Sequence, residues 1–170
     1  MKAVIERELA GRTVKTVAWA MLLMCLMVLV RYILIKGGPD HFKQHFENVN
    51  GTEMLTNGFR RANFTPFASF VYFYKIRYRF GYVIKNVIGN ILGFIPLGFL
   101  LPVLFSSLRT ARKAIWTVFL ISLLFETLQL IFNLGVFDVD DLLLNTVGGA
   151  VGYLLFITGI ALIEIQMRKT

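Results

Sequence analysis

Carboxylate and amide side chains stand inside stretches of this sequence that are otherwise apolar. The stretch LLFETLQLIF (residues 123–132) contains Glu126 and Gln129, and Ser122 and Asn133 continue the same spacing of three and four residues. At about 100° per helical residue, these side chains form one polar stripe. A charged group at membrane depth costs about 2.5–3.5 kcal/mol and is kept mainly where it pairs or functions. The stripe therefore indicates either hydrogen bonds between helices or a site for a polar ligand.

Polar residues with helical spacing also begin two other apolar stretches. Asn86 and Asn90 are four residues apart, and Asn145 follows a group of aspartates. Since a helix advances about 1.5 Å per residue, Asn90 and Asn145 are expected about 5 Å, and Glu126 about 9 Å, from the same end of a bundle. Amides could simply bridge helices, and Asp138 could cap a helix. The candidate ligand-binding residues are Glu126, Gln129, Asn86, Asn90, Asp138, Asp141 and Asn145.

The elements that must hold these residues are membrane-spanning helices. The chain has 170 residues, 56% of them hydrophobic, and a mean hydropathy of +0.67, which is too apolar for a soluble domain of this size. A span needs about 20 apolar residues, and the sequence predicts spans at residues 17–35, 87–105, 114–132 and 142–163. The first is longer than the apolar core of a signal peptide, so we expect it to be retained. The predicted fold is an all-α integral membrane bundle of four transmembrane helices, with an extracytoplasmic segment between the first two.

The charges of the short connections predict the topology. Residues 106–113 contain Arg109, Arg112 and Lys113 and no acid, whereas residues 133–141 contain three aspartates and no base. The positive-inside rule places the basic connection, and with it both termini, in the cytoplasm. We therefore expect a cytoplasmic N-terminus at 1–15, a membrane domain at 16–155 that includes an outer segment at 36–85, and at 156–170 the end of the fourth helix with a cytoplasmic C-terminus.

The outer segment, residues 36–85, is basic and ends in a stretch rich in aromatic residues. It holds eight Lys or Arg against three Asp or Glu, which conflicts with the positive-inside rule, although the rule weakens for long loops. An anionic partner is implied, either lipid head groups or acidic envelope polymers, whereas nucleic acid is not expected. The aromatic stretch could be a belt on the outer leaflet or a recognition surface. The residues of this basic aromatic surface are Arg60, Arg61, Lys75, Arg77, Tyr78 and Arg79.

Two local patterns in the outer segment have weaker implications. Asn57 and Gly58 form a dipeptide typical of a turn. His41 and His45 have the spacing of a helical metal clamp, but no motif completes the ligand set. We therefore expect no metal and no cofactor.

Four motifs resemble the VanZ-like family of bacterial membrane proteins: NFTPF (63–67), NVIGNILGFIPLGFLLP (86–102), FETLQ (125–129) and FDVDDLLLNTVGG (137–149). The resemblance covers about residues 60–155. Many relatives have arginine where this chain has Val136, so a role of that arginine is missing here or is taken by Arg60, Arg61 or the basic residues 75–79. The resemblance implies importance for the candidate ligand-binding residues other than Asn90 and for Asn63, Pro66, Phe67, Pro96, Gly98 and Gly148, and its last motif includes Gly149.

The resemblance also implies a function. The founding member of the family lowers susceptibility to teicoplanin without belonging to the D-alanyl-D-lactate pathway. We expect a protein of the bacterial cell membrane that binds or shields an amphiphile in an outer-leaflet polar pocket, either a lipid-linked cell-wall precursor or a lipoglycopeptide. One alternative is an enzyme that modifies an envelope lipid, with Glu126 or an aspartate as general base. Another is a lipid transporter or flippase, which the apolar inner halves of the helices disfavour.

Overall fold

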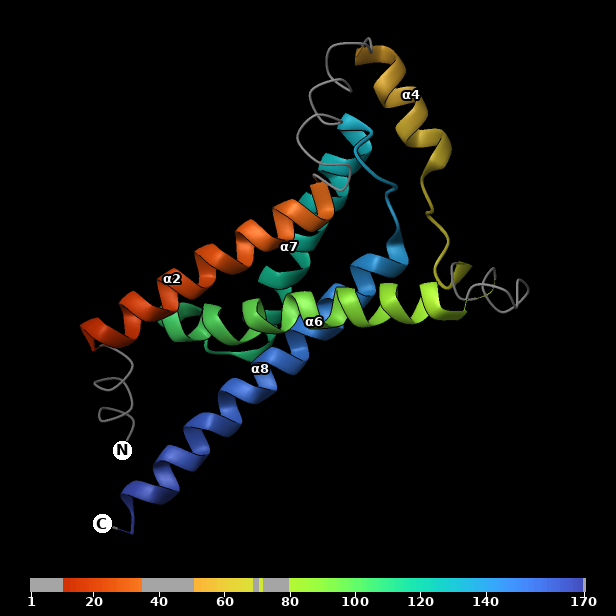
Figure 1. Ribbon diagram of the computed structural model, residues 1–170. Helices are drawn as coiled ribbons and strands as arrows, with labels where there is room; N and C mark the ends of the chain where they lie inside the picture. Colours follow the sequence, from red (N-terminus) through yellow and green to blue (C-terminus); the bar gives the residue numbers. More distant parts are fainter. Residues whose placement is uncertain (1–10, 35–50, 69–70, 72–79, 170) are drawn as a thin grey trace.

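The described part of the chain is a set of helices. The computed structural model describes residues 11–34, 51–68, 71 and 80–169 (Figure 1). Four of its helices are long and apolar enough to cross a membrane, which confirms the predicted all-α fold. The elements are α2 (Arg12–Leu29), a π turn η1 (Val30–Leu34), α4 (Gly51–Arg61), α6 (Phe80–Leu104), a 3₁₀ turn η3 (Ser106–Leu108), α7 (Ala111–Phe132) and α8 (Val139–Met167).

The candidate spans include the predicted ones with small shifts at their ends. They run over Arg12–Leu34, Ile84–Leu104, Ala111–Phe132 and Val139–Met167. The start of α2 and the end of α8 lie toward the same end of the bundle, as an even number of spans requires (Figure 1). The side of the membrane on which this end lies stays a prediction.

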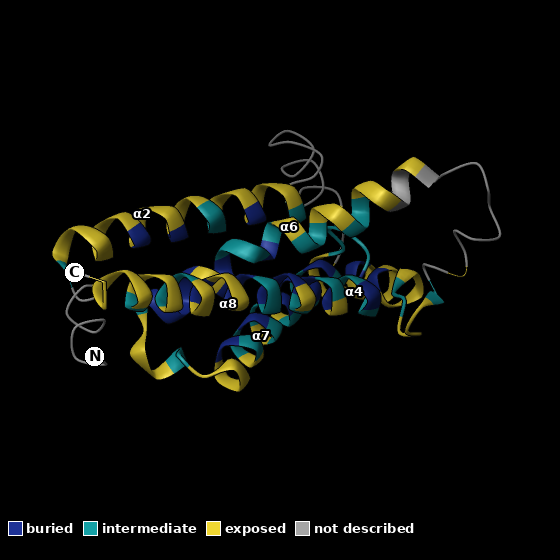
Figure 2. Cartoon of the chain, turned by 90° about the horizontal axis from the view of Figure 1, so that it is seen from below, coloured by how far each residue is buried: buried dark blue, intermediate teal, exposed yellow. Residues whose placement is uncertain are grey.

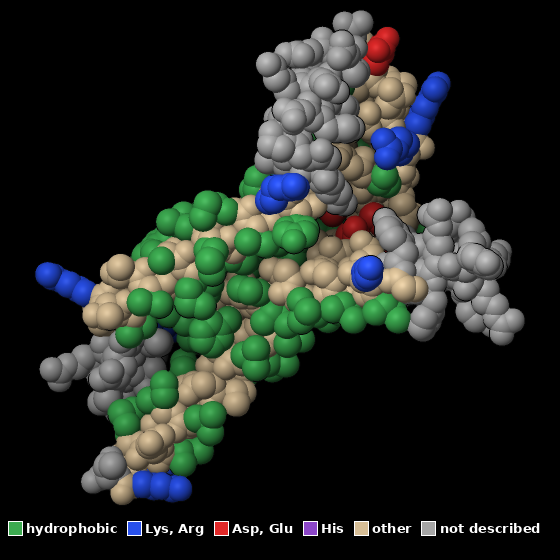
Figure 3. Space-filling model, viewed as in Figure 1, with side chains coloured by type: hydrophobic (Ala, Val, Ile, Leu, Met, Phe, Trp, Pro, Cys, Tyr) green, Lys and Arg blue, Asp and Glu red, His purple; other side chains and the backbone are tan. Residues whose placement is uncertain are grey.

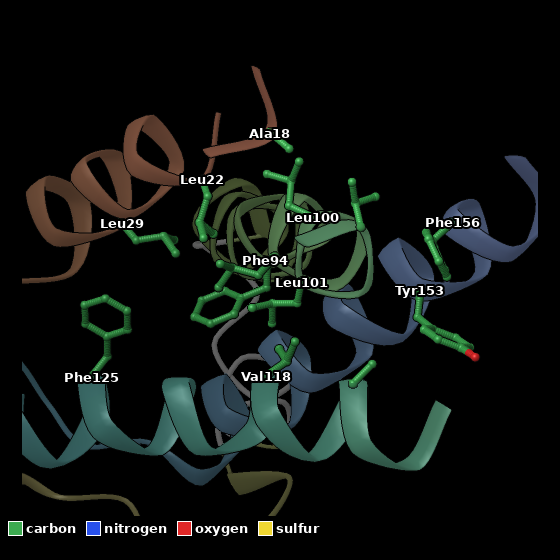
Figure 4. Packing of buried hydrophobic residues seen from close by; sticks show 13 residues of the cluster. Ala18, Leu22, Leu29, Phe94, Leu100, Leu101, Val118, Phe125, Tyr153 and Phe156 are labelled. Carbon is green, nitrogen blue, oxygen red and sulfur yellow. The ribbon is translucent and has the colours of Figure 1, made fainter. Parts of the chain in front are cut away.

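Helix α6 lies at the centre of the bundle and packs mainly against α8. Its side chains Phe94, Leu97 and Leu100 are almost completely buried, and Figure 4 shows Leu22 of α2 and Val118 of α7 among the side chains around them. Outward-facing positions are exposed on each long helix (Figure 2). Because lipid tails are as apolar as leucine, close packing rather than hydrophobic burial holds such helices together.

Glycines let the backbones of α6 and α8 approach closely. A Cβ atom at Gly98 would lie 2.0 Å from the Gly149 carbonyl oxygen, and one at Gly148 would lie 2.2 Å from the Ile91 oxygen. Gly152 makes a similar approach. The spacing of Gly89 and Gly93 suggests another such contact, but Gly89 has no neighbouring atom within 4 Å of the position of a Cβ.

The two prolines of α6 do not end the helix where they stand. Helix α6 continues through Pro96 and ends at Leu104, shortly after Pro102. The carbonyl oxygen of Pro102 accepts a hydrogen bond of 3.3 Å from Arg109 Nε. This interaction satisfies a helix-terminal carbonyl group that has no partner within the helix.

The turn expected at Asn57 and Gly58 is wrong, because both residues lie within α4. A Cβ at Gly58 would lie 2.1 Å from the carbonyl oxygen of Leu130 in α7. Glycine is therefore needed here for contact between two helices and not for a change of chain direction.

Replacing Gly58 with alanine is expected to push α4 away from α7, despite the intrinsic gain of about 1 kcal/mol in helix propensity. Hydrogen exchange of α4, followed by mass spectrometry on the purified protein, would then be faster than in the wild type. Gly51→Ala is the matched control, since no atom lies within 4 Å of a Cβ at Gly51. Equal exchange in the two variants would contradict the assignment of Gly58 as a contact residue.

Candidate functional site

A pocket of about 580 Å³ lies among α2, the π turn, α6, α7 and α8. Figure 3 shows acidic side chains recessed beside α6, with basic side chains nearby on the surface. We call Asn86, Asn90, Glu126, Gln129, Asp141 and Asn145 the polar cluster, and Val28, Leu29, Leu92 and Phe94 the apolar wall; all ten line the pocket. The structure thus brings together six of the seven residues that the sequence singled out as ligand-binding candidates, and leaves Asp138 outside the lining.

Asp141 connects α8 to α6 within the polar cluster. Its Oδ1 atom accepts hydrogen bonds from Asn86 Nδ2 at 2.8 Å and from Asn90 Nδ2 at 2.6 Å. The spacing of four residues places both amides on the same face of α6, opposite the first turn of α8. The positive end of the α8 dipole also favours a carboxylate at this position.

Glu126 links α7 to the loop that precedes α8. Its side chain is 2% exposed, and its Oε2 atom accepts a hydrogen bond of 3.0 Å from the backbone N–H of Asp138. Asp138 in turn caps α8, because its carboxylate accepts from the N–H of Asp140 at 2.8 Å. Asp138 therefore orients the start of α8 rather than lining the pocket.

The NFTPF motif binds to the FDVDD motif beside the pocket. Asn63 forms a parallel β-bridge with Asp138, and Asn63 Nδ2 donates to the Asp138 carboxylate at 2.9 Å. Two residues farther on is Thr65, whose N–H donates to Asn63 Oδ1. Phe67, which follows Pro66 and has a positive φ of 65°, donates its N–H to the carboxylate of Asp140. Both motifs were singled out from the sequence, but nothing in it predicted that they pair, and Asp140 was not among the predicted site residues.

The Gln129 side chain is hydrogen-bonded to the π turn of the first span. Its Nε2 atom donates to the backbone oxygen of Ile33 at 2.9 Å. Such π turns are frequent at functional sites. Helix α7 ends just beyond, where Asn133 adopts a left-handed φ of 49° and the N–H of Leu134 donates to the Gln129 oxygen. This is the Schellman arrangement, which explains why an asparagine follows Phe132.

Only one of the two polar atoms of the Asn145 side chain has a hydrogen-bond partner among the described residues. Its Nδ2 atom donates to Ser122 Oγ at 2.8 Å, and the side chain is 1% exposed. Its Oδ1 atom is buried without a hydrogen-bond partner among the described residues. A buried polar atom of this kind is rare in folded proteins and calls for an explanation.

The basic aromatic surface is described only in part. Arg60 and Arg61 lie exposed in α4 and do not line the pocket, and Arg61 Nη1 donates to Asn133 Oδ1 at 3.4 Å. This contact places one arginine next to the connection that contains Val136. The predicted residues Lys75, Arg77, Tyr78 and Arg79, and the pair His41 and His45, lie outside the described residues.

Two further polar side chains that line the pocket, Tyr32 and Lys85, were not among the predicted site residues. Lys85 lies four residues before Gly89, which also lines the pocket, so the two share one face of α6. Tyr32 lies in the π turn, and no motif marked it.

Comparisons with known proteins agree with the motifs. The VanZ/LLP1 family model matches residues 17–163. Protein VanZ from Enterococcus faecium is 36% identical over 97 residues, which are 57% of this chain and 53% of that protein. The chain therefore spans about half the length of this relative. No solved structure matches the chain.

Proposed function

Because this chain belongs to the VanZ/LLP1 family, we propose that it lowers the susceptibility of a bacterium to teicoplanin-type glycopeptide antibiotics. In this proposal it acts in the cell membrane by binding an amphiphilic envelope molecule. The ligand is either a lipid-linked cell-wall precursor, which the protein shields, or the acylated antibiotic itself.

The observation that carries the proposal is the combination of the polar cluster and the apolar wall in one pocket. An amphiphile needs both kinds of surface, since its head group seeks hydrogen bonds and its chains seek apolar contacts. The buried carboxylate of Glu126 supports a role in binding, because a charged group in a membrane helix is expensive and commonly marks a ligand site.

The orientation of the pocket supports an envelope ligand. The pocket lies near the amino ends of α6 and α8, whereas the basic connection with Arg109, Arg112 and Lys113 joins the opposite end of α6 to α7. If the positive-inside rule holds for this connection, the pocket opens on the outer side of the membrane, where these antibiotics and their targets are found.

Glu126→Gln tests the proposal. Glutamine keeps an oxygen that can accept from the Asp138 N–H, but it removes the charge that a ligand would meet. Losing a charge-assisted hydrogen bond is expected to weaken ligand binding about tenfold or more, so the minimal inhibitory concentration of teicoplanin should fall toward that of cells without the protein. Glu164→Gln, at the far end of α8, is the matched control.

Membrane levels of both variants must equal that of the wild type, as measured by immunoblot of isolated membranes. Unchanged teicoplanin susceptibility in Glu126→Gln at a normal level would refute the proposed role of the pocket.

A further inference from the structure

The unpartnered oxygen of Asn145 points to a ligand with a hydrogen-bond donor. Asn145 lines the pocket, and its amide nitrogen is already engaged by Ser122 at 2.8 Å. The Oδ1 atom is buried and has no hydrogen-bond partner among the described residues. An N–H or O–H group of a ligand in the pocket would satisfy this atom.

The neighbours of Asn145 have the same preference for donors. Glu126 and Asp141 also line the pocket, and an ionised carboxylate can only accept hydrogen bonds. One amide N–H of Asn86 and one of Asn90 are directed to Asp141, so these two donors are engaged within the protein. Carboxylates together with an acceptor oxygen favour a cation that carries N–H groups, and among membrane phospholipid head groups this is a primary ammonium group.

The rest of the pocket suits a phospholipid. Val28 is 48% exposed and Leu92 is 58% exposed, and both lie in candidate membrane spans. The pocket lining therefore includes one residue of α2 and one of α6 that are also exposed on the apolar surface of the bundle, where acyl chains can contact them. Lys85, an exposed residue of the same pocket, offers a cation near the end of its span, where lysine side chains meet lipid phosphates.

We infer that the pocket binds a phospholipid whose head group carries a primary amine. The ammonium group lies among Asn145 Oδ1, Glu126 and Asp141, the phosphate lies beside Lys85, and the acyl chains contact the apolar wall. A trimethylammonium head group has the same charge but no N–H group, so it leaves Asn145 Oδ1 unsatisfied. The inference concerns the pocket of the proposed function but goes beyond that function, because this phospholipid is neither the cell-wall precursor nor the antibiotic.

Native mass spectrometry of the purified full chain tests this inference. The detergent-solubilised protein is mixed with phosphatidylethanolamine or phosphatidylcholine of identical acyl chains, and the bound fraction is measured at increasing lipid concentration. We expect the wild type to retain phosphatidylethanolamine at about tenfold lower concentration, the usual effect of a hydrogen bond to a charged group. Equal retention of both lipids overturns the inference.

Variants test whether Asn145 causes the preference for phosphatidylethanolamine over phosphatidylcholine. Asn145→Leu is expected to lose the tenfold preference while still retaining phosphatidylcholine. Asn145→Asp, which keeps an acceptor oxygen, is expected to keep the preference. A preference that survives in Asn145→Leu overturns the inference, and so does a preference that is lost in Asn145→Asp.

The other ligand source and the proposed function are tested separately. If teicoplanin and not phosphatidylethanolamine is retained with this dependence on Asn145, the lipid assignment is overturned. If Asn145→Leu loses the lipid preference but cells that express it keep wild-type teicoplanin susceptibility, the lipid inference stands and the proposed function fails.

Discussion

Replacing Gly152 with valine is expected to prevent α6 and α8 from packing together. A Cβ at this position would lie 2.0 Å from the Ile95 carbonyl oxygen and 2.9 Å from the Phe99 nitrogen. Both atoms belong to the α6 backbone, so no side-chain rearrangement can relieve the clash. Overpacking of a close interface costs about 1–3 kcal/mol and more where backbone must move, so we expect a cost of at least about 3 kcal/mol.

The measurement is thermal unfolding in detergent, followed by size-exclusion chromatography of the surviving folded fraction. Gly159→Val is the matched control on the same helix, because no atom lies within 4 Å of a Cβ at Gly159. It should melt close to the wild type, whereas Gly152→Val should be recovered mainly as aggregate. The same melting temperature for both would show that close approach at Gly152 is not needed.

Asp141→Ala is the second change with a large expected effect. It removes the acceptor shared by Asn86 Nδ2 and Asn90 Nδ2 and leaves two donors unpaired in an apolar bundle. An unsatisfied buried donor costs about 1–3 kcal/mol. Both asparagines are half-buried, so we expect the lower part of this range for each, and a clear fall in melting temperature.

Asp141→Asn separates stability from charge. The amide oxygen can still accept from both asparagines, so this variant should melt near the wild type, but it lacks the negative charge proposed to face the ligand. We expect teicoplanin susceptibility to rise in Asp141→Asn as well as in Asp141→Ala. Resistance that is retained in Asp141→Asn while Asp141→Ala unfolds would mean that Asp141 serves the fold alone.

Helix existence and the polar faces could be predicted from the sequence, because both depend on local periodicity. Runs of apolar residues place the four spans to within a few residues, and the i, i+4 spacing of Asn86 and Asn90 indicates a shared face. The stripe of Ser122, Glu126 and Gln129 is buried as a unit. The capping of α8 by Asp138 could also be foreseen, since N-caps are set by nearest neighbours in the chain.

Contacts between distant segments could not be predicted in this way. Asn63 and Asp138 are 75 residues apart, and no periodicity relates them. Glycine spacing alone did not distinguish Gly89, which lines the pocket, from Gly148, which packs on Ile91. Asn57 and Gly58 form a dipeptide typical of a turn, but both lie in a helix, α4, that packs against the Leu130 carbonyl. This tertiary contact overrides the local preference for a turn.

The sequence by itself therefore determined that this protein is a four-span helical membrane protein with buried carboxylates and amides near one end, because composition and helical period are local properties. Only the tertiary structure decided which polar groups satisfy one another. It pairs Asp141 with two asparagines, Glu126 with the Asp138 backbone and Gln129 with Ile33, and it leaves Asn145 Oδ1 buried without a partner among the described residues. Hydrogen bonds depend on distances of a few ångströms between helices, and helix packing sets those distances.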